Sequence, residues 1–175
     1  MIFPKLRLFI FIVNQMPVNK LYRSLRNVLF TVLLLPAMNN NSFAQTYLFY
    51  LHGAIVENQG ADAVSPSFGA YRYNDIIAAF SKEGFTVKSE VRKPDTDVKS
   101  YAQLVAKQIN ELLKQGVKAG NITVAGASKG AVIAMHVSGF AKSKELNFVF
   151  LAACNDGNFE SYPALQFYGN ILLMG

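Results

Sequence analysis

The sequence predicts an α/β protein whose sheet is mostly parallel and has helices on both faces. Short runs that are apolar at nearly every position alternate with longer segments of helical periodicity. Such runs, separated by helices, are typical of parallel strands that are buried on both faces. In addition, the pentapeptide at residues 126–130 (Gly-Ala-Ser-Lys-Gly) stands between an apolar run and a helical segment. This spacing is typical of a tight turn that joins a strand to a helix.

The first elements follow residue 45. Residues 46–51 are an apolar, aromatic run and predict a buried strand. Residues 54–69, which contain two glycines and a proline, predict a loop. A helix is expected over residues 71–82, with Gly84 at the position after the C-cap where glycine often ends a helix. Residues 85–91 predict the second strand.

The second half begins with the turn at residues 94–97, which can cap the helix predicted over residues 98–115. Apolar side chains recur every three or four residues along that helix, as expected when one face is buried. Residues 122–125 predict the strand before the pentapeptide, and residues 131–140 predict a buried helix because they are apolar on nearly every side. Two further strands are predicted: 147–153 and 167–173.

The first 44 residues have the composition of an export signal. Basic residues precede an apolar stretch at 28–38, and Ser42-Phe43-Ala44 has small residues where a signal peptidase reads, so we expect cleavage before Gln45. Residues 1–15 add a second hydrophobic piece, which suggests that translation begins at Met16. The apolar stretch is shorter than the roughly 20 residues that cross a bilayer, so no stable membrane span is expected after cleavage. A membrane-tethered N-terminus and a leader without a special role are the alternatives.

Charge and cysteine content exclude some classes of protein. Five of the 17 basic residues and none of the 11 acidic residues lie in the first 44 positions, so the net charge of +6 falls to +1 for the rest. The remainder has no basic stripe with interleaved aromatic residues, and we expect no nucleic-acid partner. Cys154 is the only cysteine, which excludes an internal disulfide.

Ser128, at the centre of the pentapeptide, is the candidate nucleophile. The turn must be so tight that only glycine or a small residue fits two positions before and after the serine. The strain would hold the hydroxyl above the sheet edge, at the N-terminus of a helix. The backbone N–H of Lys129 would then be one oxyanion donor. The loop after the first strand, at Gly53 and Ala54, would supply the second.

Three short motifs together resemble the α/β-hydrolase superfamily: Leu-His-Gly at 51–53, Ser-Glu-Val-Arg at 89–92 and the pentapeptide at 126–130. Within it the chain resembles an uncharacterised bacterial group of exported serine hydrolases, over roughly residues 46–175. The resemblance implies cleavage of an ester, thioester or amide bond in a small-molecule substrate, without cofactor or metal. It also implies that the ring of His52 braces the oxyanion loop, although direct proton transfer or simple exposure of this histidine stays open.

The sequence departs from that family after Ser128. The resemblance implies an acid and then a histidine, but no histidine follows His136. His136 lies eight residues after Ser128 on the same predicted helix, about 12 Å along its axis, and cannot reach the hydroxyl. We therefore expect a hydrolase domain at 45–175 that is incomplete at its C-terminus, with the histidine beyond it. Asp156 is a candidate for the acid, with a surface loop residue as the alternative.

Two charged side chains near these motifs are open to more than one interpretation. Glu57 is a solvent-exposed loop carboxylate, a residue that lines the pocket, or the partner of a basic residue such as Arg72 or Arg92. The Lys129 side chain is expected to face solvent. The predicted function is an exported serine hydrolase, and the alternative is a non-catalytic binding protein with the hydrolase fold. A nucleotide-binding role is not favoured, because the chain has neither Gly-x-Gly-x-x-Gly nor a P-loop.

Overall fold

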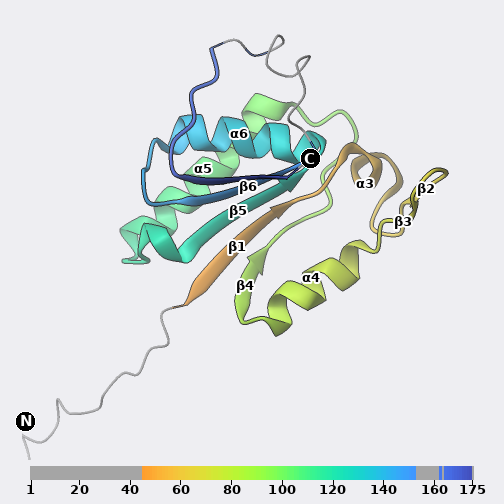
Figure 1. Ribbon diagram of the computed structural model, residues 1–175, viewed down its shortest axis with the longest axis horizontal. Coiled ribbons are helices and arrows are strands. Elements are labelled where there is room, and N and C mark those ends of the chain that lie inside the picture. The colour runs from red at the N-terminus through yellow and green to blue at the C-terminus, as the bar shows by residue number, and fades with distance from the viewer. Residues whose placement is uncertain (1–44, 153–161, 163, 175) are drawn as a thin grey trace, which may run out of the picture. The chain divides into compact units, whose positions relative to one another are not determined.

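The computed structural model describes residues 45–152, 162 and 164–174, all of them within one compact unit. The predicted leader, with its start at Met16, lies outside the described residues. The described part forms a five-stranded sheet of order β4-β1-β5-β6-β7 in which every pairing is parallel (Figure 1). Its strands are β1 (Thr46–Leu51), β4 (Phe85–Lys88), β5 (Ile122–Ala127), β6 (Asn147–Leu151) and β7 (Asn170–Met174). The predicted α/β class is confirmed.

One face of the sheet is covered by α5 (Val98–Lys114) and α6 (Lys129–Ala141). Alternate strand residues, among them Phe49, Val124 and Phe148, point to this side and form the larger core with the two helices. Every residue of α6 from Gly130 to Ser138 is buried, as its apolar composition predicts.

The opposite face is covered by the short helix α3 (Ala54–Gln59) and by α4 (Tyr73–Lys82). The strand residues between those of the larger core, such as Leu48 and Tyr50, form a smaller core with Val56 and Tyr73. Helices therefore lie on both faces of the sheet. Among the described residues, no helix has the length and apolarity needed to cross a membrane.

The prediction of a loop over 54–69 is wrong. This segment contains α3 and the two-stranded antiparallel pair of β2 (Val64–Ser65) and β3 (Gly69–Ala70). A helix of six residues has fewer than two turns, so apolar periodicity cannot reveal it.

Several element boundaries differ from the prediction. The strand predicted to reach residue 91 ends at Lys88, because the chain leaves the sheet there and the Arg92 N–H donates to the ring of His52 instead of a neighbouring strand. α4 begins at Tyr73 rather than 71, because Arg72 has a left-handed backbone (φ 58°). The last strand begins at 170 rather than 167. A turn at Gly169 (φ 103°) precedes it. A short 3-10 helix, Ala119–Asn121, leads into β5.

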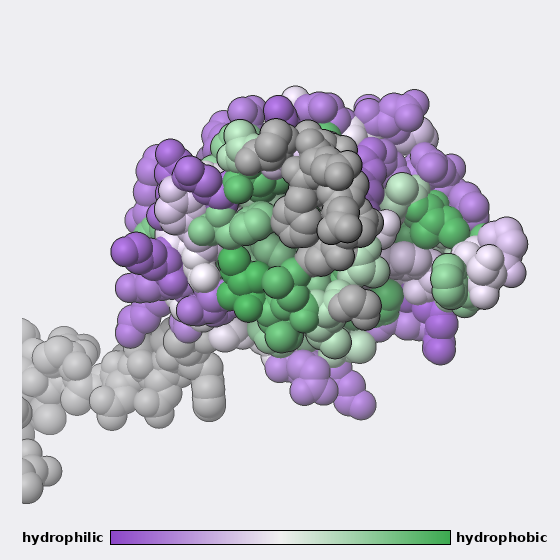
Figure 2. Space-filling view, turned by 45° about the horizontal axis from the view of Figure 1, so that its top comes forward, coloured by the Kyte–Doolittle hydropathy of each residue, from purple (hydrophilic) through white to green (hydrophobic). Residues whose placement is uncertain are grey.

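The edge strand β7 is apolar and exposed. All five of its residues are exposed, and Leu172 and Leu173 are each 55% accessible. Figure 2 shows a hydrophobic area near the middle of that view. An edge strand of this kind presents unpaired backbone groups and apolar side chains together.

Candidate functional site

The candidate site lies at the carboxyl ends of two neighbouring strands, β1 and β5, from which the chain continues to opposite faces of the sheet. After β1 the chain passes to α3 and α4 on one face of the sheet, and after β5 it passes to α6 on the other. The register pairs Leu51 with Gly126, so the two strands end side by side. In open α/β sheets, ligands bind in the crevice formed at such a point, outside the carboxyl ends of the strands.

Ser128 joins β5 to α6 in a strained conformation. Its backbone angles are φ 52° and ψ −122°, a region that residues other than glycine rarely occupy and that costs about 1–3 kcal/mol. Its N–H donates to the carbonyl of Leu151 (2.9 Å), and its own carbonyl accepts from the N–H of Ala131 (2.8 Å). The residue is exposed. Ser128 is therefore an exposed residue at the carboxyl end of β5, where the strand turns into α6.

The two glycines of the pentapeptide are required by close backbone contacts. A Cβ on Gly126 would overlap the carbonyl of Gly130. A Cβ on Gly130 would overlap the carbonyl groups of Leu51 and His52. The turn at Ser128 is thus packed directly against the end of β1, with no room for a side chain between them.

The loop after β1 touches this turn. A Cβ placed on Gly53 would lie 3.5 Å from the Cβ of Ser128. The Gly53 N–H donates to the hydroxyl of Tyr71 (3.2 Å), which is also hydrogen-bonded to the hydroxyl of Tyr50 (2.9 Å). The amide of Gly53, one of the predicted oxyanion donors, is therefore already engaged within the protein.

The other two predicted oxyanion donors, the amides of Ala54 and Lys129, have no hydrogen-bond acceptor within their own helices. Ala54 is the first residue of α3 and Lys129 is the first residue of α6. The first N–H groups of a helix have no carbonyl partner within it. These two amides are therefore the candidate donors to a negatively charged oxygen bound near Ser128.

His52 is fully buried, and both of its ring nitrogens are engaged. Nε2 accepts from the backbone N–H of Arg92 (3.0 Å), and Nδ1 lies 2.9 Å from the carbonyl oxygen of Gly53. Because Nε2 accepts, the proton is on Nδ1, which donates to that carbonyl. Burial lowers the pKa of His52 below its usual 6.5, so the ring is neutral at pH 7. No ring nitrogen is left to take a proton from Ser128.

Glu57 is buried rather than solvent-exposed, at 3% accessibility. Its carboxylate accepts from Arg92 Nε (3.0 Å), Lys129 Nζ (2.5 Å) and the backbone N–H of Thr96 (3.1 Å). Burial raises the pKa of this carboxyl. The hydrogen bonds from Lys129 and Arg92 lower the pKa by more than burial raises it, so the pKa lies below its usual 4.5. Of the two arginines considered from the sequence, Arg92 is the partner.

The other predictions for charged residues near the site have different outcomes. Arg72 pairs with Asp75 at the surface (2.7 Å). The expectation that the Lys129 side chain faces solvent is wrong, because it is directed to Glu57 and is only one quarter exposed. The partners of Glu57 were not predictable from local patterns, because Arg92 and Lys129 lie 35 and 72 residues away in the sequence. Asp156 and Cys154 lie outside the described residues.

His136 lies in the protein core. It is 7% accessible, and its ring lies 4.8 Å from that of Tyr162 and 6.2 Å from that of Phe140. Burial lowers its pKa below 6.5. Its position in α6 and its aromatic neighbours give it no role at Ser128.

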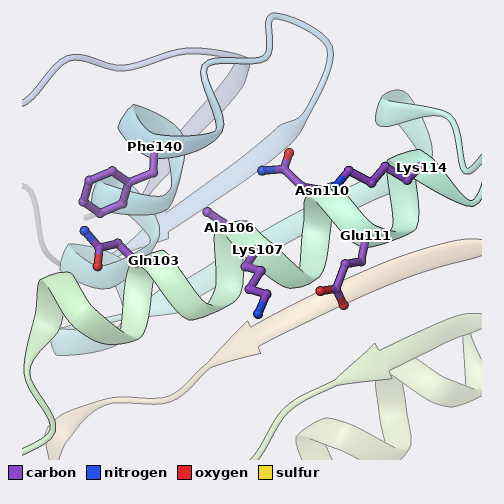
Figure 3. Close-up of a pocket in the computed structure, with 7 residues that line it drawn as sticks. All are labelled: Gln103, Ala106, Lys107, Asn110, Glu111, Lys114 and Phe140. Atoms are coloured by element: carbon purple, nitrogen blue, oxygen red, sulfur yellow. The ribbon is translucent and has the colours of Figure 1, made fainter.

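Two hollows on the described surface lie away from Ser128. A cavity of about 320 Å³ lies along the outer side of α5 and is bordered by Phe140 of α6. Figure 3 shows the residues that line it. The second, of about 590 Å³, lies beside His136. Neither is bordered by Ser128 or Gly53. Within residues 45–152, 162 and 164–174, no group of three or more acidic, histidine or cysteine side chains could hold a metal ion.

No family model matches this chain, and neither the curated proteins nor the solved structures contain a match to it. The turn at Ser128 and the loops beside it are therefore the features of the chain that bear on its function.

Proposed function

We propose that this protein is a serine hydrolase with the α/β-hydrolase fold that cleaves an ester-like bond in a small-molecule substrate. The main support is the backbone of Ser128: an exposed serine in a strained left-handed conformation, between a central parallel strand and a buried helix. This arrangement matches the strand–turn–helix context in which the Gly-x-Ser-x-Gly spacing positions a nucleophile.

In the proposed reaction, the Oγ of Ser128 attacks the carbonyl carbon of an ester, thioester or amide. The carbonyl oxygen becomes negatively charged and accepts hydrogen bonds from the N–H groups of Lys129 and Ala54. One such donor typically contributes about 3–4 kcal/mol to stabilisation of the transition state. The leaving group departs with a proton, and water then hydrolyses the acyl-serine ester. The proposal needs no cofactor or metal.

The general base of this proposal is not one of the two histidines. His52 uses both ring nitrogens within the fold, and His136 is buried in the core beside α5. The proposal therefore assigns the base to a residue outside the described part of the chain. Asp156 remains the proposed acid.

The alternative is a binding protein that has the hydrolase fold without catalysis. It is favoured by one observation, namely that neither described histidine can accept the proton of Ser128. A catalytic triad without its base loses several orders of magnitude in rate.

Labelling with a fluorophosphonate distinguishes the two functions. The protein expressed from its complete coding sequence should form a phosphonyl adduct on Ser128, located by mass spectrometry, and should hydrolyse short p-nitrophenyl esters. The Ser128→Ala variant should lose both. A matched variant, Ser67→Ala, changes an exposed serine on the β2–β3 turn and should keep both. A folded preparation that is neither labelled nor active would reject the hydrolase and favour the binding protein.

We also propose export, supported by the composition of the leader. Expression in a bacterial host should yield a mature protein in the exported fraction that begins at Gln45, as measured by intact mass. A protein that keeps residues 16–44 and stays in the cytoplasm would contradict this proposal.

A further inference from the structure

A buried group of charges lies next to the two candidate oxyanion donors. It consists of Glu57, Arg92 and Lys129, named here the Glu57 cluster. The side chains of Glu57 and Arg92 are 2% and 1% exposed, and that of Lys129 is 25% exposed. Removing charges from water is costly, and an apolar replacement of similar volume is often as stable as a buried ion pair. Stability alone therefore does not account for this cluster.

The Glu57–Lys129 ion pair joins the two elements that supply the amides. Glu57 lies in α3, three residues after Ala54, whose N–H is one donor. Lys129 is the first residue of α6, and its own N–H is the other donor. The contact between Nζ and Oε1 (2.5 Å) therefore joins α3 directly to the first residue of α6.

Arg92 fixes the loop that precedes Ala54. Its Nε donates to Oε2 of Glu57, while its Nη2 donates to the carbonyl of His52 and its backbone N–H donates to the ring of the same residue. The carboxylate of Glu57 thus has one oxygen directed to α6 and the other to the group that holds residues 52–53. No other described side chain accepts from both Arg92 and Lys129.

We infer that Glu57 is a positioning residue of the oxyanion hole. Its carboxylate sets the distance and direction between the N–H groups of Ala54 and Lys129, and it acts through the Lys129 and Arg92 side chains without touching substrate. This inference rests on the proposed hydrolase function. Its consequence is specific: disturbing the cluster weakens stabilisation of the transition state more than binding of the ground state, so kcat falls while KM changes little.

The first test removes the lysine of the Glu57–Lys129 ion pair. In Lys129→Met the side chain has a similar length and the backbone N–H remains. Glu57 keeps its ion pair with Arg92, so the protein should still fold. We expect kcat for a p-nitrophenyl ester to fall about tenfold to a hundredfold, less than the loss of a whole donor causes, with KM changed less than threefold. Lys129→Arg, which retains the charge, should recover most of the activity. Lys107→Met, on the outer side of α5 (Figure 3), is the matched control and should have no effect.

The second test uses Glu57→Gln together with the double variant Glu57→Gln/Lys129→Met. Glu57→Gln disturbs the contact with Arg92 as well as that with Lys129, so the double variant should lose about as much kcat as Glu57→Gln alone. Losses that multiply, or single variants with the activity of Lys107→Met in an active wild-type background, would overturn the positioning role.

A measurement independent of turnover separates this inference from the proposed function. The amide resonances of Ala54 and its neighbours in α3 should shift in ¹H–¹⁵N spectra of Lys129→Met and stay unchanged in Lys107→Met. Shifted amides in a protein without esterase activity would reject the hydrolase function while supporting the structural coupling. Unshifted amides would overturn the coupling itself, whatever the activity.

Discussion

Replacing Gly130 with alanine tests the contact between α6 and the end of β1. The new Cβ would overlap the carbonyl group of Leu51 and the carbonyl oxygen of His52. These are backbone atoms, and no side-chain rotation can relieve the overlap. Leu51 also belongs to β1, which is hydrogen-bonded to strands on both sides. Either α6 must move away from the sheet or the loop after β1 must be displaced.

The expected cost follows from two opposing effects. Overpacking typically costs about 1–3 kcal/mol, and overlap with several backbone atoms puts Gly130→Ala at the upper end. Alanine stabilises a helix by about 1 kcal/mol relative to glycine. We therefore expect the free energy of unfolding to fall by about 2 kcal/mol.

Gly139→Ala is the matched control in the same helix. It has the same gain in helix propensity but only one close contact, 3.1 Å from its Cβ to the carbonyl oxygen of Gln166, so its stability should change by less than about 1 kcal/mol. Urea unfolding followed by circular dichroism measures both variants, and the slope m should be unchanged. If Gly130→Ala were as stable as Gly139→Ala, the close contact proposed to require glycine would be refuted.

Three further predictions concern pH, the core and the sheet edge. The folded-state pKa values of His52 and His136 lie below 6.5, so the unfolded chain binds protons first and stability should fall as the pH drops below about 6.5. Glu57, with a folded-state pKa below 4.5, should add a second loss below about pH 4.5; a free energy of unfolding that is constant from pH 7 to pH 4 would contradict both. Phe150→Ala removes a ring that is 1% exposed and should cost about 3–5 kcal/mol in urea unfolding, whereas a loss under 1 kcal/mol would show a loosely packed core. Leu172→Lys, on the exposed edge strand, should change stability by less than about 0.5 kcal/mol. It should also reduce any self-association that the wild-type protein shows in light scattering; association unchanged by the substitution would mean that this edge is not the contact surface.

The sequence alone was sufficient where the signal is local or periodic. The parallel sheet follows from apolar runs such as residues 46–51 and 147–153, the second of which contains β6, and α5 follows from its apolar stripe. The turn at Ser128 is also predictable, because its glycines stand within two residues of it. α3 was missed because six residues between a strand and Gly60 show no period.

The electrostatic part of the site could not be predicted in the same way. The partners of Glu57 come from the segment after β4 and from the start of α6. Local patterns treat an isolated glutamate in a loop as a surface residue, which is the common case. Likewise, the bond from the Gly53 N–H to the hydroxyl of Tyr71 joins residues 18 positions apart. Only the packing of the loops at the carboxyl ends of β1 and β5 brings these groups together.

The left-handed backbone at Ser128 also has an evolutionary consequence. Glycine adopts such angles without strain, so a Ser128→Gly change would make the protein more stable by up to about 1–3 kcal/mol. Most natural proteins lie only a little above the stability that they need, and a lineage with no use for the hydroxyl would gain from the exchange. A serine at this position therefore lowers the stability of the folded protein, and it is expected to persist only while selection favours its hydroxyl oxygen.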